Sequence, residues 1–479
     1  MLLLWIVLAV LALLVLLLLV AVVRTILFVK PKRSEYKPVP APEREAEYAG
    51  KLSEMIKYET VSYKDKPDVE KFLGFHRVLE ELFPLVHANL EKTEIDGNLL
   101  FKWKGESSEK TVVLMSHQDV VPAEGEWKKA PFGGEVSEGR VWGRGAADIK
   151  GGVMAFFQAC EELLAEGVTP RYDIYLSSSC TEEVGGDGCP KLVAEMKRRG
   201  VTPWLVCDEG GAIVDTPIGG CPGSYAMMGV VEKGQGNLEF IARSTGGHSS
   251  TPPKNSPIVR LAKFALDIEK HDPLKVEFIP QCRAMFETIA PYGPFAYRLL
   301  FGNMWLFAPL IKKVLPAISP AAGALIKTTI AFTMQSGSAG YNVLPQEAKL
   351  IANMRFAPHQ GMDESIAAVR AVAEKYGLET RLIDGYDYCP PVSTESEAFR
   401  YEASVVEKVF PGLPVVPYVM TGGTDARFYS SICDACIRFT PILYGPEQMA
   451  GMHGLNECVD TIALPGAVDF YKTLIRDLK

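Results

Sequence analysis

Acidic residues and histidines follow apolar runs at five places along the chain, always close to the point where a run ends. They are His117 in VVLMSHQD, Asp148 in GRGAADIKGG, the pair Glu182 and Glu183 in SSSCTEEVGG, Asp208 in LVCDEGG, and His453 in GMHGLNE. Two histidines with three or four carboxylates are the ligands that a pair of borderline metal ions prefers. The pattern restricts the fold to one that brings strand ends together, and it predicts a metal-dependent reaction.

Short β-rich runs alternate with helical stretches around these residues. The runs cover residues 111–116, 172–177, 204–207 and 435–440, and helical spacing marks residues 152–165 and 191–199 between the first three. Such alternation favours a mostly parallel sheet with helices on both faces, where sites form beyond the carboxyl ends of the strands. We therefore expect an α/β catalytic domain, built from residues 43–223 and 389–479, with the acids and histidines at one sheet edge.

A second unit with α+β character occupies residues 224–388, inside the first because His453 lies beyond it. Strands are expected at residues 237–242, 348–356 and 379–383, and a helix at residues 364–376. The uncharged runs 299–311 and 314–326 are broken by proline and too short to span a bilayer, so we expect packed helices there. Contact of these helices with the membrane surface or with a partner subunit is the alternative.

The N-terminal residues 1–23 carry no charged side chain and consist mainly of Leu, Val and Ala. At about 1.5 Å per residue, a helix of this length spans a bilayer core of roughly 30 Å, so we predict a single-pass membrane anchor. A cleaved export signal is the alternative, although no A-x-A cleavage site follows. Residues 24–42 form a charged, Pro-rich linker. The basic residues after the span are Arg24, Lys30, Lys32, Arg33 and Lys37.

Because no charged side chain precedes the span, the positive-inside rule places the body of the chain in the cytoplasm. The net charge of -8 argues against nucleic acid as a partner. The ten cysteines show no compact disulfide spacing, which fits a reducing compartment. Cys433 and Cys436 could form a redox or zinc pair, but nothing nearby supplies the other ligands, so we expect two buried thiols.

The joint pattern resembles the di-zinc aminoacylase/carboxypeptidase family, which includes yeast carboxypeptidase S, the ArgE/DapE deacylases and secreted N-acyl-amino-acid hydrolases. The resemblance covers residues 43–479, and the apolar insertion at residues 283–330 is typical of the carboxypeptidase S branch. It implies a zinc-peptidase catalytic domain with an inserted lid or dimerisation domain, two zinc ions that cobalt or manganese could replace, and a homodimer. A catalytic domain outside the cytoplasm, as in carboxypeptidase S, is the alternative to the charge-based topology.

The family's ligand positions match His117 and Asp208 for one metal, Glu183 and His453 for the other, and Asp148 for the carboxylate that bridges the two. Glu209 is the alternative to Asp208, because related branches place this carboxylate slightly differently. Asp119 resembles the carboxylate that fixes the tautomer of the His117 imidazole.

The resemblance also implies catalytic and substrate-binding residues. Glu182 matches the general base, which stays free of metal so that it can take a proton from water. His248 in TGGHSSTPP matches the donor to the developing oxyanion, supplied by a partner subunit or by lid closure. Asn342 and Arg355 match substrate positions. An arginine suits bidentate capture of a carboxylate, although in a strand it can equally form a structural ion pair.

The loop at residues 422–425 offers backbone N–H groups, those of Gly423 and Thr424 among them, that could bind the same substrate carboxylate. A simple tight turn before a helix is the alternative. The chain is thus predicted to be a membrane-anchored hydrolase of an amide bond next to a free carboxylate, in an N-acyl amino acid or a short peptide. A dipeptidase of the same fold, a condensing enzyme run in reverse, and a non-catalytic metal-binding scaffold are the rivals.

Overall fold

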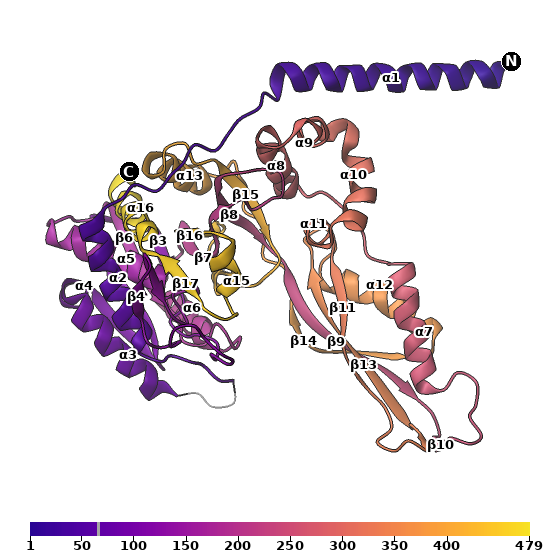
Figure 1. The fold of residues 1–479 in the computed structure, drawn as a ribbon. Coiled ribbons are helices and arrows are strands. Elements are labelled where there is room, and N and C mark those ends of the chain that lie inside the picture. Colours follow the sequence, from indigo (N-terminus) through magenta and orange to yellow (C-terminus); the bar gives the residue numbers. More distant parts are fainter. Residues whose placement is uncertain (65–67) are drawn as a thin grey trace.

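The computed structural model describes residues 1–64 and 68–479, and its body consists of a large α/β domain and a smaller α+β domain (Figure 1). An eight-stranded sheet runs through the large domain. Its strands, in spatial order, are β1 (Glu91–Ile95), β2 (Asn98–Trp103), β6 (Tyr172–Ser178), β3 (Ser107–Met115), β7 (Leu205–Asp215), β16 (Cys436–Tyr444), β8 (Ser224–Glu232) and β15 (Val415–Met420).

The middle of this sheet is parallel, as the sequence predicts. Strand β3 pairs in parallel with β6 and β7, and β7 with β16. At one edge of the sheet, β8 pairs in parallel with β15 but runs antiparallel to β7 and β16. Strands β1 and β2 add an antiparallel edge next to β6. Every residue of β6 is buried, which is expected of a strand that helices cover on both faces.

Two groups of helices cover the sheet. Helix α5 (Lys150–Ala165) contacts β3, β6 and β16, and α2 (Pro42–Lys57) and α16 (Leu464–Asp477) pack on α5. Helix α6 (Gly188–Arg198) contacts β2, and the short α14 (Ala426–Tyr429) contacts β7. The remaining elements of this domain are α3 (Val69–Leu82), α4 (Pro84–Asn89), α13 (Glu397–Val409), α15 (Pro446–Gly451), η2 (Thr461–Ala463) and a small sheet of β17 (Cys458–Asp460), β5 (Arg140–Trp142) and β4 (Glu135–Ser137).

The smaller domain, called the lid here, is an antiparallel sheet in the order β11 (Thr329–Ser336), β13 (Glu347–Phe356), β9 (Gly234–Arg243) and β14 (Glu379–Tyr386). Helices α7 (Pro257–Lys270) and α12 (Met362–Lys375) pack on it through a core that includes Phe240, Phe264 and Val369. The short pair β10 (Gly247–His248) and β12 (Val343–Leu344) forms the tip of the lid farthest from the large domain (Figure 1).

Two expectations about the insertion need correction. The second unit was expected to begin at residue 224, but residues 224–232 form β8 of the central sheet, so the lid begins with Lys233 and β9. The apolar sequence of β8 does not indicate which of the two sheets it joins. The apolar stretch forms α8 (Pro280–Ile289), η1 (Ala290–Tyr292), α9 (Phe295–Phe301), α10 (Met304–Ile318) and α11 (Pro320–Ala324). These are packed helices, but Met285, Phe286 and Phe301 join the core of the large domain and leave the lid core separate.

Helix α1 (Leu2–Phe28) is longer than the span predicted from charge alone and continues past Arg24. Among residues 1–64 and 68–479 it is the one helix long and apolar enough to cross a membrane, and a signal sequence near an N-terminus meets the same criteria. Its last turns lie against α9, where Ala21 and Thr25 are fully buried (Figure 1). An extended segment then leads to α2.

Candidate metal centre

One group of metal-binding side chains gathers around His117, two residues after β3. His117 Nε2 lies 3.2 Å from Asp148 Oδ1 and 3.6 Å from Glu209 Oε1. The other ring nitrogen, Nδ1, donates to the backbone carbonyl of Asp119 at 2.8 Å. This bond leaves the Nε2 lone pair pointing at the two carboxylates, which is the arrangement that a metal ligand needs.

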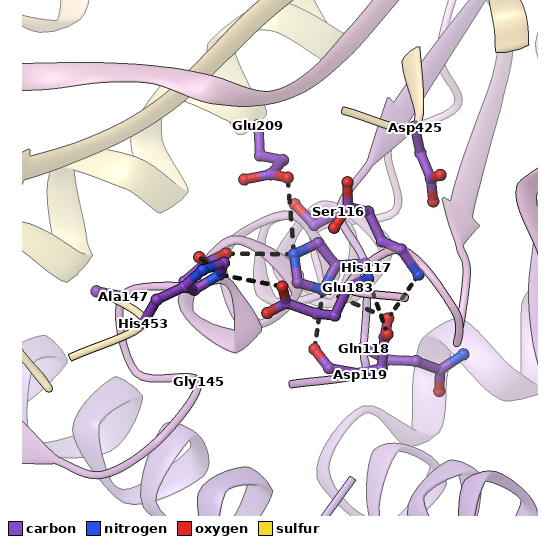
Figure 2. A network of polar contacts seen from close by, with 12 residues as sticks. Ser116, His117, Gln118, Asp119, Gly145, Ala147, Glu183, Glu209, Asp425 and His453 are labelled. Carbon is purple, nitrogen blue, oxygen red and sulfur yellow. Dashed lines mark hydrogen bonds and ion pairs between the residues drawn. The ribbon is translucent and has the colours of Figure 1, made fainter. Parts of the chain in front are cut away.

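A second group shares Asp148 with the first. His453 Nε2 lies 3.1 Å from Asp148 Oδ2 and 3.0 Å from Glu183 Oε2. His453 has a positive φ of 54°, an uncommon backbone conformation that places its imidazole opposite these acids. Each oxygen of Asp148 thus faces a different set of side chains, Oδ1 the pair His117 and Glu209, and Oδ2 the pair Glu183 and His453. Figure 2 shows His117 beside Glu209, and His453 beside Glu183.

Asp208 does not join this arrangement, although the sequence favoured it over Glu209. Its Oδ2 accepts the backbone N–H of Ala426 at 2.7 Å, at the start of α14. Strand β7 continues to Asp215 and does not end at residue 208, and neighbouring residues of a strand point to opposite faces. An irregularity in the β7–β16 pairing follows Asp208, and Glu209 is the residue whose carboxylate faces His117.

Asp119 connects the histidine to both glutamates. Its carboxylate accepts the backbone N–H of Glu182 at 3.2 Å and that of Glu183 at 3.1 Å, and the Ser62 hydroxyl at 2.7 Å. Asp119 Oδ1 also lies 3.5 Å from His117 Nδ1, farther than its own backbone carbonyl. The side chain thus orients the glutamate turn, and its backbone orients the imidazole.

Glu457 is a residue of the site that the sequence reasoning missed. It is fully buried, and its Oε1 accepts the backbone N–H groups of Gly145, Ala147 and Asp148 at 3.1, 2.8 and 2.9 Å. Its Oε2 accepts from Arg144 Nη1 at 2.6 Å. The Glu457 carboxylate therefore holds the loop that carries Asp148. Its place four residues after His453 was the available signal.

Negative charge is concentrated at these residues. Burial, with the charge of Asp148 second, raises the pKa of Glu209 well above its ordinary value. Hydrogen bonds to Asp148 and then to Glu183 raise the pKa of His453 to about 10. Burial acts to raise the pKa of Asp148, but bonds from His117 and His453 outweigh it and hold that pKa well below its usual range. So many buried carboxylates can ionise together only when cations accompany them.

The donor set fits a pair of divalent metal ions. It combines two imidazole nitrogens with three carboxylates, the ligand types that zinc, cobalt and manganese accept. Glu183 Oε1 is buried and has no hydrogen-bond partner among residues 1–64 and 68–479, which is rare for a carboxylate oxygen unless it binds an ion or water. His117 and Glu209 would hold one ion, Glu183 and His453 the other, with Asp148 between them.

Glu182 lies beside the metal ligands, and among the described residues it forms no ion pair with His117 or His453. It lines a cavity of about 230 Å³ together with Asp148, Glu183, Glu209 and His453. Burial raises the pKa of Glu182 well above its ordinary value, and the charge of His117 acts against this shift. A raised pKa close to a metal pair is what a carboxylate needs to accept and return a proton near neutral pH.

Arg427 approaches Glu182 from α14 and was not singled out from the sequence. Its Nη1 donates to the Thr424 carbonyl at 2.8 Å and lies 3.9 Å from Glu182 Oε1. The guanidinium also stacks over the ring of Tyr386, 5.0 Å from the centroid. The sequence signal was the position of Arg427 three residues after Thr424, on the turn that follows residues 422–425, called the glycine loop here.

A buried ion pair supports the glycine loop through Thr424. Arg438 Nη2 lies 2.8 Å from Glu232 Oε2, and both side chains are buried. Glu232 accepts the Thr424 backbone N–H at 3.2 Å and the Thr424 hydroxyl at 3.1 Å. The N–H of Thr424 is therefore already used, whereas Gly422 and Gly423 line the cavity beside Glu182.

An apolar cavity of about 560 Å³ opens from the metal centre. It shares Asp148 and Glu209 with the ligand groups. Its other walls come from the central sheet and from the apolar helices, and include Met227, Tyr418, Met285, Phe286, Ala322 and Leu325. A long hydrocarbon group attached to a polar head can thus be accommodated with the head at the metals.

The remaining predicted residues lie in the lid. His248 is exposed in β10, where its Nδ1 contacts the Ser250 hydroxyl at 2.8 Å, and Asn342 directly precedes β12. Both are at the tip of the lid, away from the metal ligands of the same chain (Figure 1). Arg355 lies at the opposite end of the lid sheet, where it pairs with Gln235 close to the junction with β8.

The cysteine pair of the large domain, Cys433 and Cys436, consists of buried free thiols.

Comparison with known proteins agrees with this geometry. The model of peptidase family M20/M25/M40 matches residues 113–477. The N-fatty-acyl-amino acid synthase/hydrolase PM20D1.1 of Danio rerio is 32% identical over 450 residues, which cover 92% of this chain and 87% of that protein. The probable carboxypeptidase S-like 2 of Dictyostelium discoideum is 31% identical, covering 90% of this chain and 85% of that protein.

Among solved structures, the metallo-carboxypeptidase Sso-CP2 of Sulfolobus solfataricus superposes with a TM-score of 0.65 at 18% identity, covering 89% of this chain and 99% of that one. The YXEP protein of Bacillus subtilis, described as a dinuclear metal binding peptidase, has a TM-score of 0.56 at 12% identity, covering 91% and 98%. These two likenesses show the fold. Together with the family match and the clustered ligands, they establish that the chain belongs to peptidase family M20/M25/M40 and is a metal-dependent hydrolase of the metallopeptidase and amidohydrolase type.

Proposed function

We propose that this enzyme hydrolyses N-acyl amino acids whose acyl group is long and apolar. The observation that carries the proposal is the apolar cavity of about 560 Å³, which begins at Asp148 and Glu209. A peptide would present polar amide groups to those walls, and burying them without partners costs free energy, whereas a hydrocarbon chain gains from burial. The name of one relative, N-fatty-acyl-amino acid synthase/hydrolase, supports this substrate, whereas the name carboxypeptidase S-like of another keeps a short peptide as the alternative.

Two zinc ions are the cofactor we propose, with cobalt or manganese able to replace them. His117, Glu209, Asp148, Glu183 and His453 would hold the pair. When bound, such a pair supplies an acidified water and a Lewis acid for the scissile carbonyl.

The chain's own residues perform the proton transfers and the positioning. Glu182 takes a proton from the attacking water and gives it to the leaving amine. The carboxylate of Asp119 accepts the backbone N–H of Glu182 and so holds Glu182 in place. Arg427 and the backbone N–H groups of Gly422 and Gly423, which line the cavity, would bind the carboxylate of the amino acid, and Arg355 would join them from the lid.

His248 and Asn342 would complete the site in a homodimer. Since both lie at the lid tip, we propose that they reach the metal centre of a second copy, where His248 donates to the developing oxyanion. Closure of the lid over its own domain is the alternative source of the same donor.

Helix α1 is proposed to anchor the enzyme in a membrane with the catalytic domain on the cytoplasmic side, following the basic residues after the span. Alkaline carbonate extraction and N-terminal sequencing separate an anchor from a cleaved signal. Labelling of an introduced surface cysteine by an impermeant reagent reports the side of the membrane.

The direct test of the reaction uses the full chain in detergent or nanodiscs. N-acyl amino acids from acetyl to oleoyl are compared with blocked short peptides, with a chelator and then with Zn²⁺ restored. We expect chelator-sensitive hydrolysis whose kcat/KM rises with acyl length. Faster cleavage of dipeptides than of any N-acyl amino acid would favour the dipeptidase alternative, and metal binding without hydrolysis would favour the scaffold.

A further inference from the structure

We propose that the outer face of α9 and α10 is a second membrane contact, seated in the lipid bilayer beside α1, through which acyl chains pass from the bilayer to the apolar cavity. The proposal rests on the membrane anchoring and the substrate class proposed above. In this proposal the apolar insertion, which also forms one wall of the cavity, is the part of the enzyme that first meets its substrate.

The end of α1 is fixed to these helices by buried polar contacts. Asn303 is fully buried, and its Nδ2 donates to Thr25 Oγ1 at 2.8 Å and to the Ala21 carbonyl at 3.3 Å. Arg298 Nε donates to the Val29 carbonyl at 2.8 Å. Because buried amides require their partners, α1 and the α9–α10 pair hold together where the span ends. The point at which the chain leaves the bilayer is therefore also the position of α9 and α10.

An exposed apolar surface begins at that point. Leu310, Val314 and Ile318 are spaced by four residues, so they form one stripe along α10, and they are 53%, 41% and 72% exposed. Trp305 and Phe295 lie exposed at the start of α10 and in α9. Aromatic side chains next to an aliphatic stripe suit the boundary between lipid headgroups and acyl chains. The continuity of this stripe with α1 identifies lipid as its partner.

The same helices reach the cavity from the other side. Ile318, the most exposed residue of the stripe, directly precedes Ser319, which lines the cavity. Helix α11 follows and contributes Ala322 to the wall, while Leu325 comes directly after it. The lipid-facing stripe and the cavity wall are thus neighbours in the chain at the α10–α11 junction. An N-acyl amino acid held in a bilayer keeps its carboxylate at the interface and its chain in the lipid, the orientation in which this junction would receive it.

Depth-dependent quenching tests the contact in the full chain. All ten native cysteines are buried, so an introduced surface cysteine can be labelled selectively with an environment-sensitive fluorophore. Leu310→Cys is the test variant, in nanodiscs that contain lipids with a quencher on the acyl chain. Leu14→Cys in α1 reports anchoring, and Val136→Cys in β4, 48% exposed, is the matched control outside the patch.

We expect the label at position 310 to be quenched, with a blue-shifted emission, and the label at position 136 to stay unquenched. Quenching at position 14 but not at position 310 would overturn the inference and leave the anchor intact. Absence of quenching at positions 14 and 310 would show that α1 is not a membrane anchor, and would overturn the inference as well. Emission at position 310 that shifts with protein concentration in the absence of lipid would assign the face to a second copy and also overturn the proposal.

Kinetics provide a second readout. Leu310→Glu with Val314→Glu places charges on the stripe without touching the cavity. For a long-chain N-acyl amino acid carried in vesicles, we expect the apparent KM to rise about tenfold, since losing the burial of one large aliphatic side chain corresponds to roughly that factor. The kcat/KM for N-acetyl amino acids in solution should not change. Equal losses for both substrates would refute a lipid-specific role.

Discussion

The sheet edge that carries the metal ligands and the tip of the lid differ in how much of their function is already assembled. At the sheet edge, His117 and Asp148 lie among fixed partners, and Asp119 and Glu457 hold the loops around them. At the lid tip, His248 is exposed and its side chain meets only a neighbouring serine, among the contacts of the described residues. One chain therefore brings all the proposed metal ligands together, whereas His248, the oxyanion donor we propose, would have to approach them from a second copy or by lid closure.

The largest effect should come from Glu182→Gln, which removes proton transfer and keeps the side-chain shape. We expect kcat to fall by about 10²–10⁴-fold, the usual contribution of a general base, while both metals stay bound. Steady-state kinetics with metal analysis of the same sample measures this. Near-normal turnover in a fully loaded variant would show that another group moves the proton.

His248→Ala tests the contribution of the lid tip to catalysis. The loss of one oxyanion donor should lower kcat by about 10²–10³-fold with little change in stability, because the residue is exposed. Mixing this variant with Glu182→Gln then identifies the source of the histidine. If it comes from a second copy, random re-assortment into dimers should restore roughly a quarter of wild-type activity. No recovery after mixing would indicate that His248 acts on its own chain.

Glu209→Gln and Asp208→Asn separate neighbouring acids at the sheet edge. Because Glu209 faces His117, the first variant should weaken binding of one metal by about 10–100-fold or more, with a matching loss of activity. Asp208→Asn retains an acceptor for the Ala426 N–H, so both metals should remain. Metal titration by isothermal calorimetry compares the two. The opposite ranking would restore Asp208 as the ligand.

The smallest effect concerns Glu402, a buried acid. In the part of the chain that the structure describes, neither of its carboxylate oxygens has a hydrogen-bond partner of good geometry, and burial, which the nearby Cys207 thiol opposes, raises its pKa to about 8 from an ordinary 4.5. The unfolded chain releases this proton near pH 4.5 and the folded chain only near pH 8, so the group's contribution to stability is lost as pH rises through that window.

Glu402→Gln should therefore flatten the fall of the free energy of unfolding between pH 5 and 8, by about 1.4 kcal/mol per pH unit at most. Denaturant titrations of both proteins across that range measure the difference. Parallel stability curves would mean that Glu402 ionises in the folded protein at its ordinary pKa.

The sequence contained the parts of this account that depend on local order. The β-rich runs and the acids after them indicated the parallel sheet and grouped His117, Asp148, the pair Glu182 and Glu183, and His453; the family resemblance then selected Glu183 as the ligand. The sequence favoured Asp208 over Glu209, whereas Glu209 faces His117, because the choice depends on the register and on the irregularity of β7 against β16.

Other parts depend on contacts between distant segments. Glu457 accepts N–H groups 309–312 residues earlier in the chain, and although it lies four residues after His453, the local sequence does not identify these partners. The same holds for Glu232 beneath Thr424. The apolar stretch could be predicted as helical, but its packing on the large domain and its share in the cavity wall follow from tertiary structure.

We propose that two metal ions share Asp148 between two sets of ligands. An anomalous difference map from crystals of the zinc-loaded enzyme would locate both ions. We expect two peaks on either side of Asp148, one next to His117 and Glu209 and the other next to Glu183 and His453. A single peak, or a peak coordinated by Asp208 in place of Glu209, would contradict it.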